Sequence, residues 1–222
     1  MSPSYKTIFT SFTFLVLCLC SVDVIQAAPV VVGGITFDDT AFIDQLDSSV
    51  GSFSFGGGAS SVEDALVGSN PNDFTFCSGG NCDLTVSFTN NAVINLAGND
   101  LAVFELGIAD LFQLTIDGTT LTFQTISTGF SAGGFNLNVA QIDLSAFGVL
   151  PGDSRTSLAF NIGVINPSSG TTASLTVIGA INNTSSTAPI PEPATMLLLS
   201  TGLAGVAAKV RKRRNARKDS EA

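Results

Sequence analysis

The sequence of 222 residues contains no histidine and no tryptophan, and it has a single tyrosine, Tyr5. The absence of histidine removes the side chain that enzymes use most often as a general base near neutral pH. The near absence of tryptophan and tyrosine removes the rings on which sugars stack best, so a lectin-like site would depend on phenylalanine. We therefore expect a protein without catalytic activity.

Charged residues are also scarce, at 12 % of the chain against 45 % apolar residues. This is about half the roughly 25 % of charged residues that is typical of soluble domains, which favours export or a membrane. Arg155 is the only basic residue in residues 28–188, which hold fourteen acidic residues. Such an acidic region excludes nucleic acid as a partner, because binding to phosphates needs a basic surface. It is compatible with cations such as calcium.

The N-terminal segment has the layout of a secretory signal peptide. Lys6 precedes an uncharged run over residues 7–22, and the small residues Ala27 and Ala28 follow. We predict a signal helix in residues 1–27, export by the Sec machinery, and cleavage between Ala27 and Ala28. A lipoprotein signal acylated at Cys18 or Cys20 is the rival interpretation, but leucine precedes each of these cysteines where a small residue is usual.

Residues 28–181 have the period-2 pattern of β-strands. The stretch "DLTVSFTN" places Leu84, Val86 and Phe88 on one face, and "LFQLTIDGTTLTFQT" predicts a hairpin that turns at Asp117-Gly118. We expect further strands at residues 52–55, 73–77, 101–105, 135–142, 157–164 and 173–178. The spacing predicts a mainly β domain, a two-sheet β-sandwich of jelly-roll-like architecture. Short helices are expected only at residues 39–49 and 61–68.

Two cysteines remain once the signal peptide is removed, Cys77 and Cys82 in "FCSGGNCDL". The Ser-Gly-Gly-Asn sequence between them suits a tight hairpin loop, across which two cysteines reach disulfide distance. We predict a Cys77–Cys82 disulfide. A zinc site is disfavoured, because only two ligands of this kind are present and histidine is absent.

Acidic residues provide the candidates for a metal site or a hydrolase site. Asp38, Asp39 and Asp100 are candidate calcium ligands, since calcium takes several oxygen ligands from loops. Asp100 with Glu105 is the candidate pair for a glycoside hydrolase, which needs two carboxyl groups roughly 5–10 Å apart. Solvated surface acids are the simpler interpretation, and we expect no obligatory cofactor.

The segment "NNAVINLAGNDLAVFELGIADLFQLTIDGTTLTFQT" resembles secreted bacterial surface proteins with a galactose-binding-like jelly-roll domain. The stretches "IDLSAFGVLPGDSRTSLAFNIGV" and "LTVIGAIN" resemble later strands of the same group, so the resemblance covers residues 92–182. It implies a jelly-roll fold. The acidic residue that such domains often carry before "VIGAIN" is absent here.

The C-terminal segment has three parts that follow a polar, Ser/Thr-rich linker at residues 182–189. Pro191, Glu192 and Pro193 form an extended triplet that prevents a helix from starting before Pro193. Residues 194–208 are uncharged and, as a helix, would be about 22 Å long, short for a hydrocarbon core of about 30 Å. With snorkelling and local thinning we predict a transmembrane helix at about residues 194–210. The basic residues that follow would stay on the cytoplasmic side: Lys209, Arg211, Lys212, Arg213, Arg214, Arg217 and Lys218.

This order of Pro-Glu-Pro, apolar helix and basic cluster over residues 190–218, with a short tail at 219–222, resembles the PEP-CTERM sorting signal. The resemblance implies recognition by an exosortase, a membrane transpeptidase of certain Gram-negative bacteria. It also implies a membrane-anchored intermediate and delivery to the cell surface or an exopolysaccharide matrix. We therefore expect an exported, non-enzymatic surface or matrix protein. The alternatives are a permanent tail anchor, a calcium-dependent carbohydrate-binding module and a secreted hydrolase.

Overall fold

The structure, a computed structural model, describes residues 28–184. The predicted signal peptide, most of the linker, the Pro-Glu-Pro triplet and the basic cluster lie outside the described residues. Within residues 28–184 the structure has no helix that is both long and apolar enough for a membrane span. The transmembrane helix at about residues 194–210 stays a prediction.

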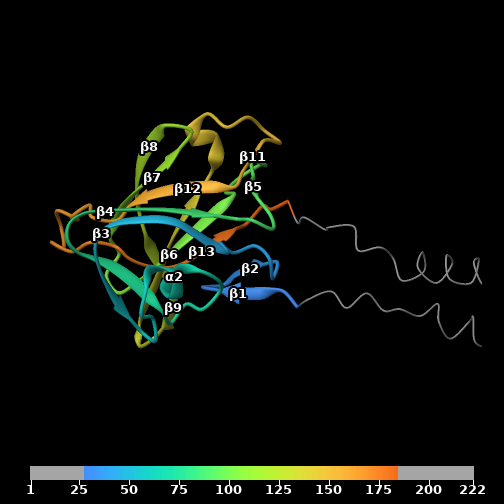
Figure 1. The fold of residues 1–222 in the computed structure, drawn as a ribbon. Coiled ribbons are helices and arrows are strands. Elements are labelled where there is room, and N and C mark those ends of the chain that lie inside the picture. The colour runs from blue at the N-terminus through green and yellow to red at the C-terminus, as the bar shows by residue number, and fades with distance from the viewer. Residues whose placement is uncertain (1–27, 185–222) are drawn as a thin grey trace, which may run out of the picture. The chain divides into compact units, whose positions relative to one another are not determined.

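The described residues are mainly β-structure, as the sequence predicts (Figure 1). Only the short helix α2 (Val62–Leu66) and one 3-10 turn, η1 (Leu144–Phe147), interrupt the strands in this part of the chain. The strands are β1 (Val30–Val32), β2 (Ile35–Phe37), β3 (Gln45–Gly56), β4 (Phe74–Ser87), β5 (Val93–Ile94), β6 (Leu101–Leu106), β7 (Leu111–Ile116), β8 (Thr119–Gln124), β9 (Ile126–Ala132), β10 (Phe135–Ile142), β11 (Ser154–Arg155), β12 (Ser157–Asn161) and β13 (Ser174–Ala180).

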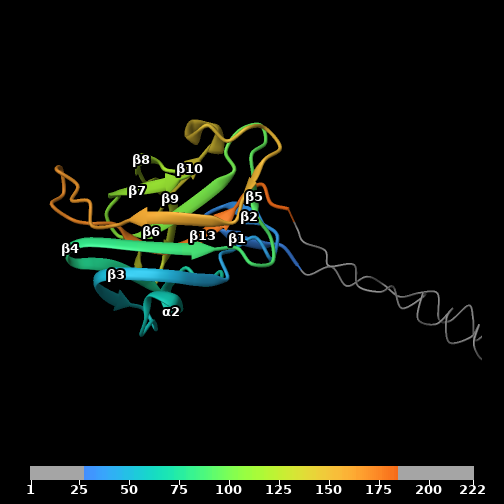
Figure 2. The ribbon, with the colours of Figure 1, turned by 45° about the horizontal axis from the view of Figure 1, so that its top comes forward.

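Nine strands form one antiparallel sheet in the order β8-β7-β12-β4-β13-β6-β10-β9, and β3 pairs with β4 beside this path. The 14-residue strand β4 connects the two halves of the sheet. Its C-terminal part pairs with β12, its N-terminal part pairs with β13, and β3 runs along both parts (Figure 2). The sequence predicts two separate sheets, whereas the structure joins both halves through β4 into a single curled sheet.

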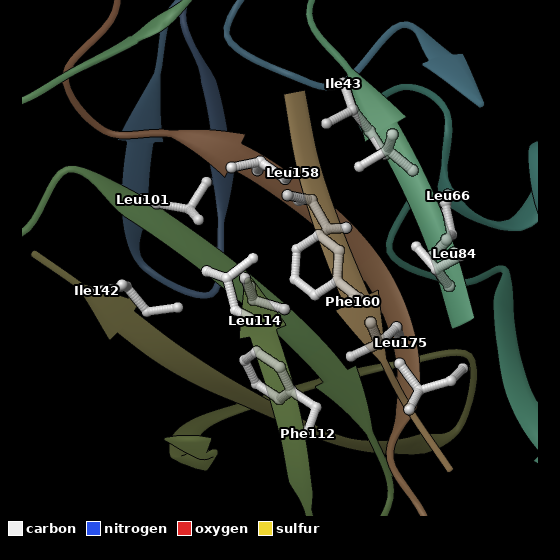
Figure 3. Packing of buried hydrophobic residues seen from close by; sticks show 14 of the residues in the cluster. Ile43, Leu66, Leu84, Leu101, Phe112, Leu114, Ile142, Leu158, Phe160 and Leu175 are labelled. Atoms are coloured by element: carbon white, nitrogen blue, oxygen red, sulfur yellow. The ribbon is translucent and has the colours of Figure 1, made fainter. Parts of the chain in front are cut away.

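Both halves of the sheet contribute side chains to one hydrophobic core (Figure 3). Phe112 and Leu114 of β7 and Phe160 of β12 come from one half, and Leu101 of β6 and Ile142 of β10 come from the other. A second cluster covers the opposite face of β6, where the β1–β2 hairpin packs on Phe104 and its neighbours. Strand β6 is therefore buried on both faces along its full length, unlike the half-exposed strand expected for a sandwich.

Two local predictions are confirmed. The hairpin at Asp117-Gly118 is confirmed: β7 and β8 pair around it, and both turn residues have positive φ, 50° and 79°. The helix predicted at residues 61–68 is present as α2, capped by the Ser61 hydroxyl, which accepts from the Asp64 N–H at 3.0 Å.

The helix predicted at residues 39–49 is wrong, because that segment turns and then enters strand β3. The Asp44 carboxylate accepts hydrogen bonds from the backbone N–H of Thr89, at 2.7 Å, and from its hydroxyl, at 2.8 Å. These bonds hold the start of β3 against the end of β4. Pairing with β4 over the length of β3 then outweighs the local helical pattern.

Cys77 and Cys82 are joined by a disulfide, with their Cα atoms 5.7 Å apart. The hairpin loop predicted between them is not formed, since both cysteines belong to the single strand β4. Residues 78–81 instead bulge out where β4 changes partner from β13 to β12, and the pairing with β3 shifts register there. The disulfide closes this bulge.

Candidate functional site

A groove of about 880 Å³ lies where the two halves of the sheet diverge, and we name it the Asp110 groove. Its volume falls in the range of small-ligand pockets, roughly 300–1,000 Å³. Strands β12 and β13 both pair with β4, but on different parts of it, so their facing ends separate. The groove residues that we use below are Phe74, Phe76, Phe135, Ile108, Ile165, Asp110, Thr171 and Ser174.

One wall of the groove is the segment between β12 and β13. Gly163 begins this segment close to the disulfide-closed bulge: a Cβ atom at this position would lie 2.6 Å from the Gly80 carbonyl oxygen. Only glycine therefore lets the chain leave β12 past the bulge without a clash. Asn166 then folds the segment into a turn, since its backbone N–H donates to the Thr171 carbonyl at 2.8 Å.

Asp110 fastens this wall to the rest of the domain. Its carboxylate accepts hydrogen bonds from the Ser169 hydroxyl at 2.7 Å and from the Thr171 hydroxyl at 2.7 and 2.6 Å. The Asn166 side-chain amide adds a bond to the Ala109 carbonyl at 3.1 Å. Since these partners lie 57 to 61 residues apart along the chain, only the folded sheet brings them together.

Glu105 lies beside Asp110 and is fully buried. Its Oε2 atom accepts hydrogen bonds from the Asp110 backbone N–H, at 3.1 Å, and from the Thr125 hydroxyl. The Oε1 atom has no hydrogen-bond partner among the described residues. The Ser174 N–H approaches the carboxyl closely enough to lower its pKa, at a geometry looser than a hydrogen bond.

Burial dominates the electrostatics of Glu105 and raises its pKa from 4.5 to about 7. The negative charge of Asp110 raises the pKa further, while the hydrogen bonds from Thr125 and Asp110 and the close approach of the Ser174 N–H lower it. Glu105 is thus an acid that changes charge near neutral pH while lying under the groove. Perturbed acids of this kind are markers of candidate functional sites.

The opposite wall of the groove is aromatic. Phe74 and Phe135 pack edge to face with ring centroids 5.6 Å apart, and Phe76 stacks beside Phe74 at 6.3 Å. Phe135 remains 48 % exposed, and Ile108 and Ile165 are also exposed. The groove therefore offers apolar surface together with the hydroxyl groups of Thr171 and Ser174.

The groove has no basic lining residue, and Asp110 is its only acidic one. Arg155 is the one basic residue of residues 28–184, and it forms an ion pair with Asp117 at 2.5 Å. The arrangement therefore disfavours anionic ligands and suits an uncharged molecule with both apolar and hydroxyl-bearing surface.

The acidic residues chosen from the sequence do not form this site. The Asp100 carboxylate is buried and accepts hydrogen bonds from the N–H groups of Leu96 and Leu144, each at 2.9 Å, and from the Asn182 amide at 2.8 Å. Asp38 accepts a hydrogen bond from the Asn183 amide at 3.1 Å. Neither residue lines the groove, nor does Asp39.

Within residues 28–184, no three His, Cys, Asp or Glu residues lie together in a way that could hold a metal ion.

The two carboxyl groups of the candidate hydrolase pair are also far apart. Asp100 directly precedes β6, and Glu105 lies near the end of this strand. The rise of about 3.3 Å per residue places their Cα atoms about 16 Å apart, too far for carboxyl groups that must lie roughly 5–10 Å from each other. Sequence reasoning missed the contact of Glu105 with Asp110, because no spacing signal distinguishes Asp110 from a surface acid.

Comparison with known families identifies the C-terminal segment. Residues 189–214 match the family model described as the PEP-CTERM protein-sorting motif. The chain carries a PEP-CTERM motif. The match includes Pro191, Glu192 and Pro193 and the basic residues up to Arg214, whereas Arg217 and Lys218 lie beyond it.

The PEP-CTERM motif implies export, a membrane-associated intermediate in a Gram-negative bacterium, and processing by an exosortase. The match covers the sorting signal and not the β-domain that it accompanies. No curated protein and no solved structure matches the chain. The galactose-binding-like resemblance of residues 92–182 stays a prediction.

Proposed function

We propose that this chain is a non-enzymatic protein of the cell surface or of an exopolysaccharide matrix. The match of residues 189–214 to the sorting motif is the observation that carries the proposal. The Sec machinery exports the chain, and the signal peptide is removed between Ala27 and Ala28. The apolar segment at about residues 194–210 holds the chain in the membrane until exosortase acts near Pro191, Glu192 and Pro193.

Replacing Pro191, Glu192 and Pro193 with alanine is expected to abolish processing. The variant accumulates in the membrane with its basic tail intact, because the recognition triplet is lost while the apolar segment and the basic cluster remain. Mass spectrometry of the membrane and extracellular fractions of the native host measures the C-terminus in each. Replacing Ser185 and Ser186 with alanine is the matched control and leaves processing unchanged. A wild-type protein that keeps its basic tail would contradict exosortase processing and indicate a permanent anchor.

Carbohydrate binding is a second candidate function, and the Asp110 groove is the observation that favours it. The exposed ring of Phe135 offers an apolar face for a sugar, and the hydroxyl groups of Thr171 and Ser174 offer hydrogen-bonding partners. The lack of basic lining residues favours an uncharged glycan. Since Asp38, Asp39 and Asp100 do not line the groove, this binding would need no calcium from those residues.

Phe135→Ala is expected to weaken binding of an uncharged oligosaccharide about tenfold, which corresponds to losing about 1.4 kcal/mol of contact energy. Calorimetric titration of the full chain with neutral fragments of the host exopolysaccharide, in the presence of EDTA, measures the affinity. Phe130→Ala is the matched control, because Phe130 is exposed to a similar degree, 55 %, on β9 outside the groove. Equal losses in the two variants, or no binding by the wild type, would contradict this function.

A further inference from the structure

Three strands of the large sheet, β3, β8 and β9, have a single pairing partner each among residues 28–184. The other edge of such a strand carries backbone N–H and C=O groups that can pair with another chain. Proteins commonly protect these edges with charged side chains, prolines or β-bulges. The three edges of this domain differ in that protection.

Strands β3 and β9 both carry protective features. The pairing of β3 with β4 shifts register three times, and β3 presents the exposed carboxylate of Asp47. The pairing of β9 with β10 shifts register between Leu137 and Asn138, opposite Gly129, whose φ is 80°. These bulges bend the two edges and prevent a second strand from pairing along their full length.

Strand β8 has none of these features. Its six residues, Thr119–Gln124, pair with β7 without a register shift, from Ile116↔Thr119 to Leu111↔Gln124. The sequence TTLTFQ contains no charge and no proline, and its threonine and phenylalanine residues favour extended structure. Figure 1 shows β8 at the border of the sheet, beyond β7.

The charge distribution is also compatible with pairing at this edge. The domain carries fourteen acidic residues and one basic residue, so two copies repel each other over most of their surface. Residues 118–142 contain no charged residue at all. The acid that borders this run, Asp117, is neutralised by Arg155 at 2.5 Å. Two copies therefore meet little repulsion where β8 faces β8, and the protective bulge of β9, not charge, distinguishes the two edges.

We propose that β8 pairs antiparallel with β8 of a second copy of this chain and continues the sheet across a two-fold axis. An antiparallel edge is self-complementary under such an axis, because each copy presents the same row of donors and acceptors. In an antiparallel pair, two residues directly opposite each other point to the same face of the sheet. Because neighbouring residues of one strand point to opposite faces, the two-fold axis must pass beside a residue and not between two residues. Near the middle of β8 this residue is Leu121 or Thr122. Leu121 and Phe123 are only partly buried in one copy, and the continued sheet places Leu121 of the other copy beside them.

Sedimentation equilibrium of the full chain in a density-matched detergent tests the proposal. The wild type is expected to show a reversible monomer–dimer equilibrium. Thr122→Glu combined with Gln124→Glu raises the dimer dissociation constant at least tenfold, because the new carboxylates at position 122 of the two copies lie close together beside the axis in either register. Ser127→Glu combined with Ser131→Glu, on the exposed edge strand β9, is the control; it adds the same net charge and leaves the constant unchanged. Thermal unfolding verifies that both variants fold.

Hydrogen exchange locates the interface. Backbone amides of β8 gain protection in the dimer, and those of β9 do not. A wild type that is monomeric at every concentration would overturn the proposal. So would an equal loss of dimer in both variants, which indicates general charge repulsion. A dimer that survives the β8 substitutions would place the contact elsewhere, including the predicted transmembrane segment with its small residues at 201–205.

Discussion

Replacing Phe112 with alanine is expected to lower the free energy of unfolding of the β-domain by about 3–5 kcal/mol. Phe112 is fully buried in β7, with ring centroids 5.9 Å from both Phe123 and Phe160. The ring lies in the core that both halves of the sheet share, as Figure 3 shows. Removing the ring loses the free energy gained by its transfer from water and leaves a cavity. The cavity cannot collapse, because β7 is paired with β8 on one side and with β12 on the other.

Urea denaturation of the purified chain measures this loss. Phe130→Ala is the matched control, because its ring is 55 % exposed on β9, and we expect a change below about 1 kcal/mol. A loss of about 3–5 kcal/mol is a large fraction of the roughly 5–15 kcal/mol by which most domains are stable. Similar effects of the two substitutions would contradict the assignment of Phe112 to the shared core.

The second large effect is expected from pH, through Glu105. Its pKa is 4.5 ordinarily and about 7 in the folded chain, where burial opposes the charged form. Between pH 4.5 and about 7, the folded state therefore keeps a proton on Glu105 that the unfolded state has released. The stability contributed by this proton is complete below pH 4.5 and is lost as the pH rises through 7. Over that window the free energy of unfolding should fall by on the order of 3 kcal/mol.

Glu105→Gln removes this dependence, because glutamine does not ionise. Denaturation midpoints at pH 5 and pH 8 should therefore differ less in the variant than in the wild type. Glu63→Gln is the control, since Glu63 is an exposed acid in α2. The carboxyls of Asp64 and Asp143 do not interfere, since hydrogen bonds from Ser60 and Ser145 lower their pKa values below 3.8, outside the window. An unchanged pH dependence in Glu105→Gln would show that Glu105 is not the titrating group.

Short-range patterns in the sequence predict the elements that depend on adjacent residues. Asp117-Gly118 predicts the β7–β8 hairpin, because a two-residue turn needs positive φ at both positions. The strand expected at residues 135–142 has the bounds of β10. The sorting motif is likewise readable from the sequence, since its three parts follow one another in order. In each case the information lies within a few residues of the feature.

The tertiary structure decides the features that depend on distant residues. The segments before and after Cys77–Cys82 read as two strands of a hairpin, but β3 pairs along both and makes them one strand. Asp100 reads as a candidate ligand, but its carboxylate is satisfied by Leu96, Leu144 and Asn182. In both cases a partner far along the chain determines the outcome.

The sequence by itself determined that this protein is mainly β and carries a PEP-CTERM motif. The curl of the sheet, the Asp110 groove, the buried acid Glu105 and the position of β8 at an edge of the sheet were decided only by the folded chain. The physical reason is that side-chain periodicity and turn chemistry act between neighbours. Burial, strand order and hydrogen bonds such as that of Thr171 with Asp110, 61 residues apart, exist only once distant segments pack together.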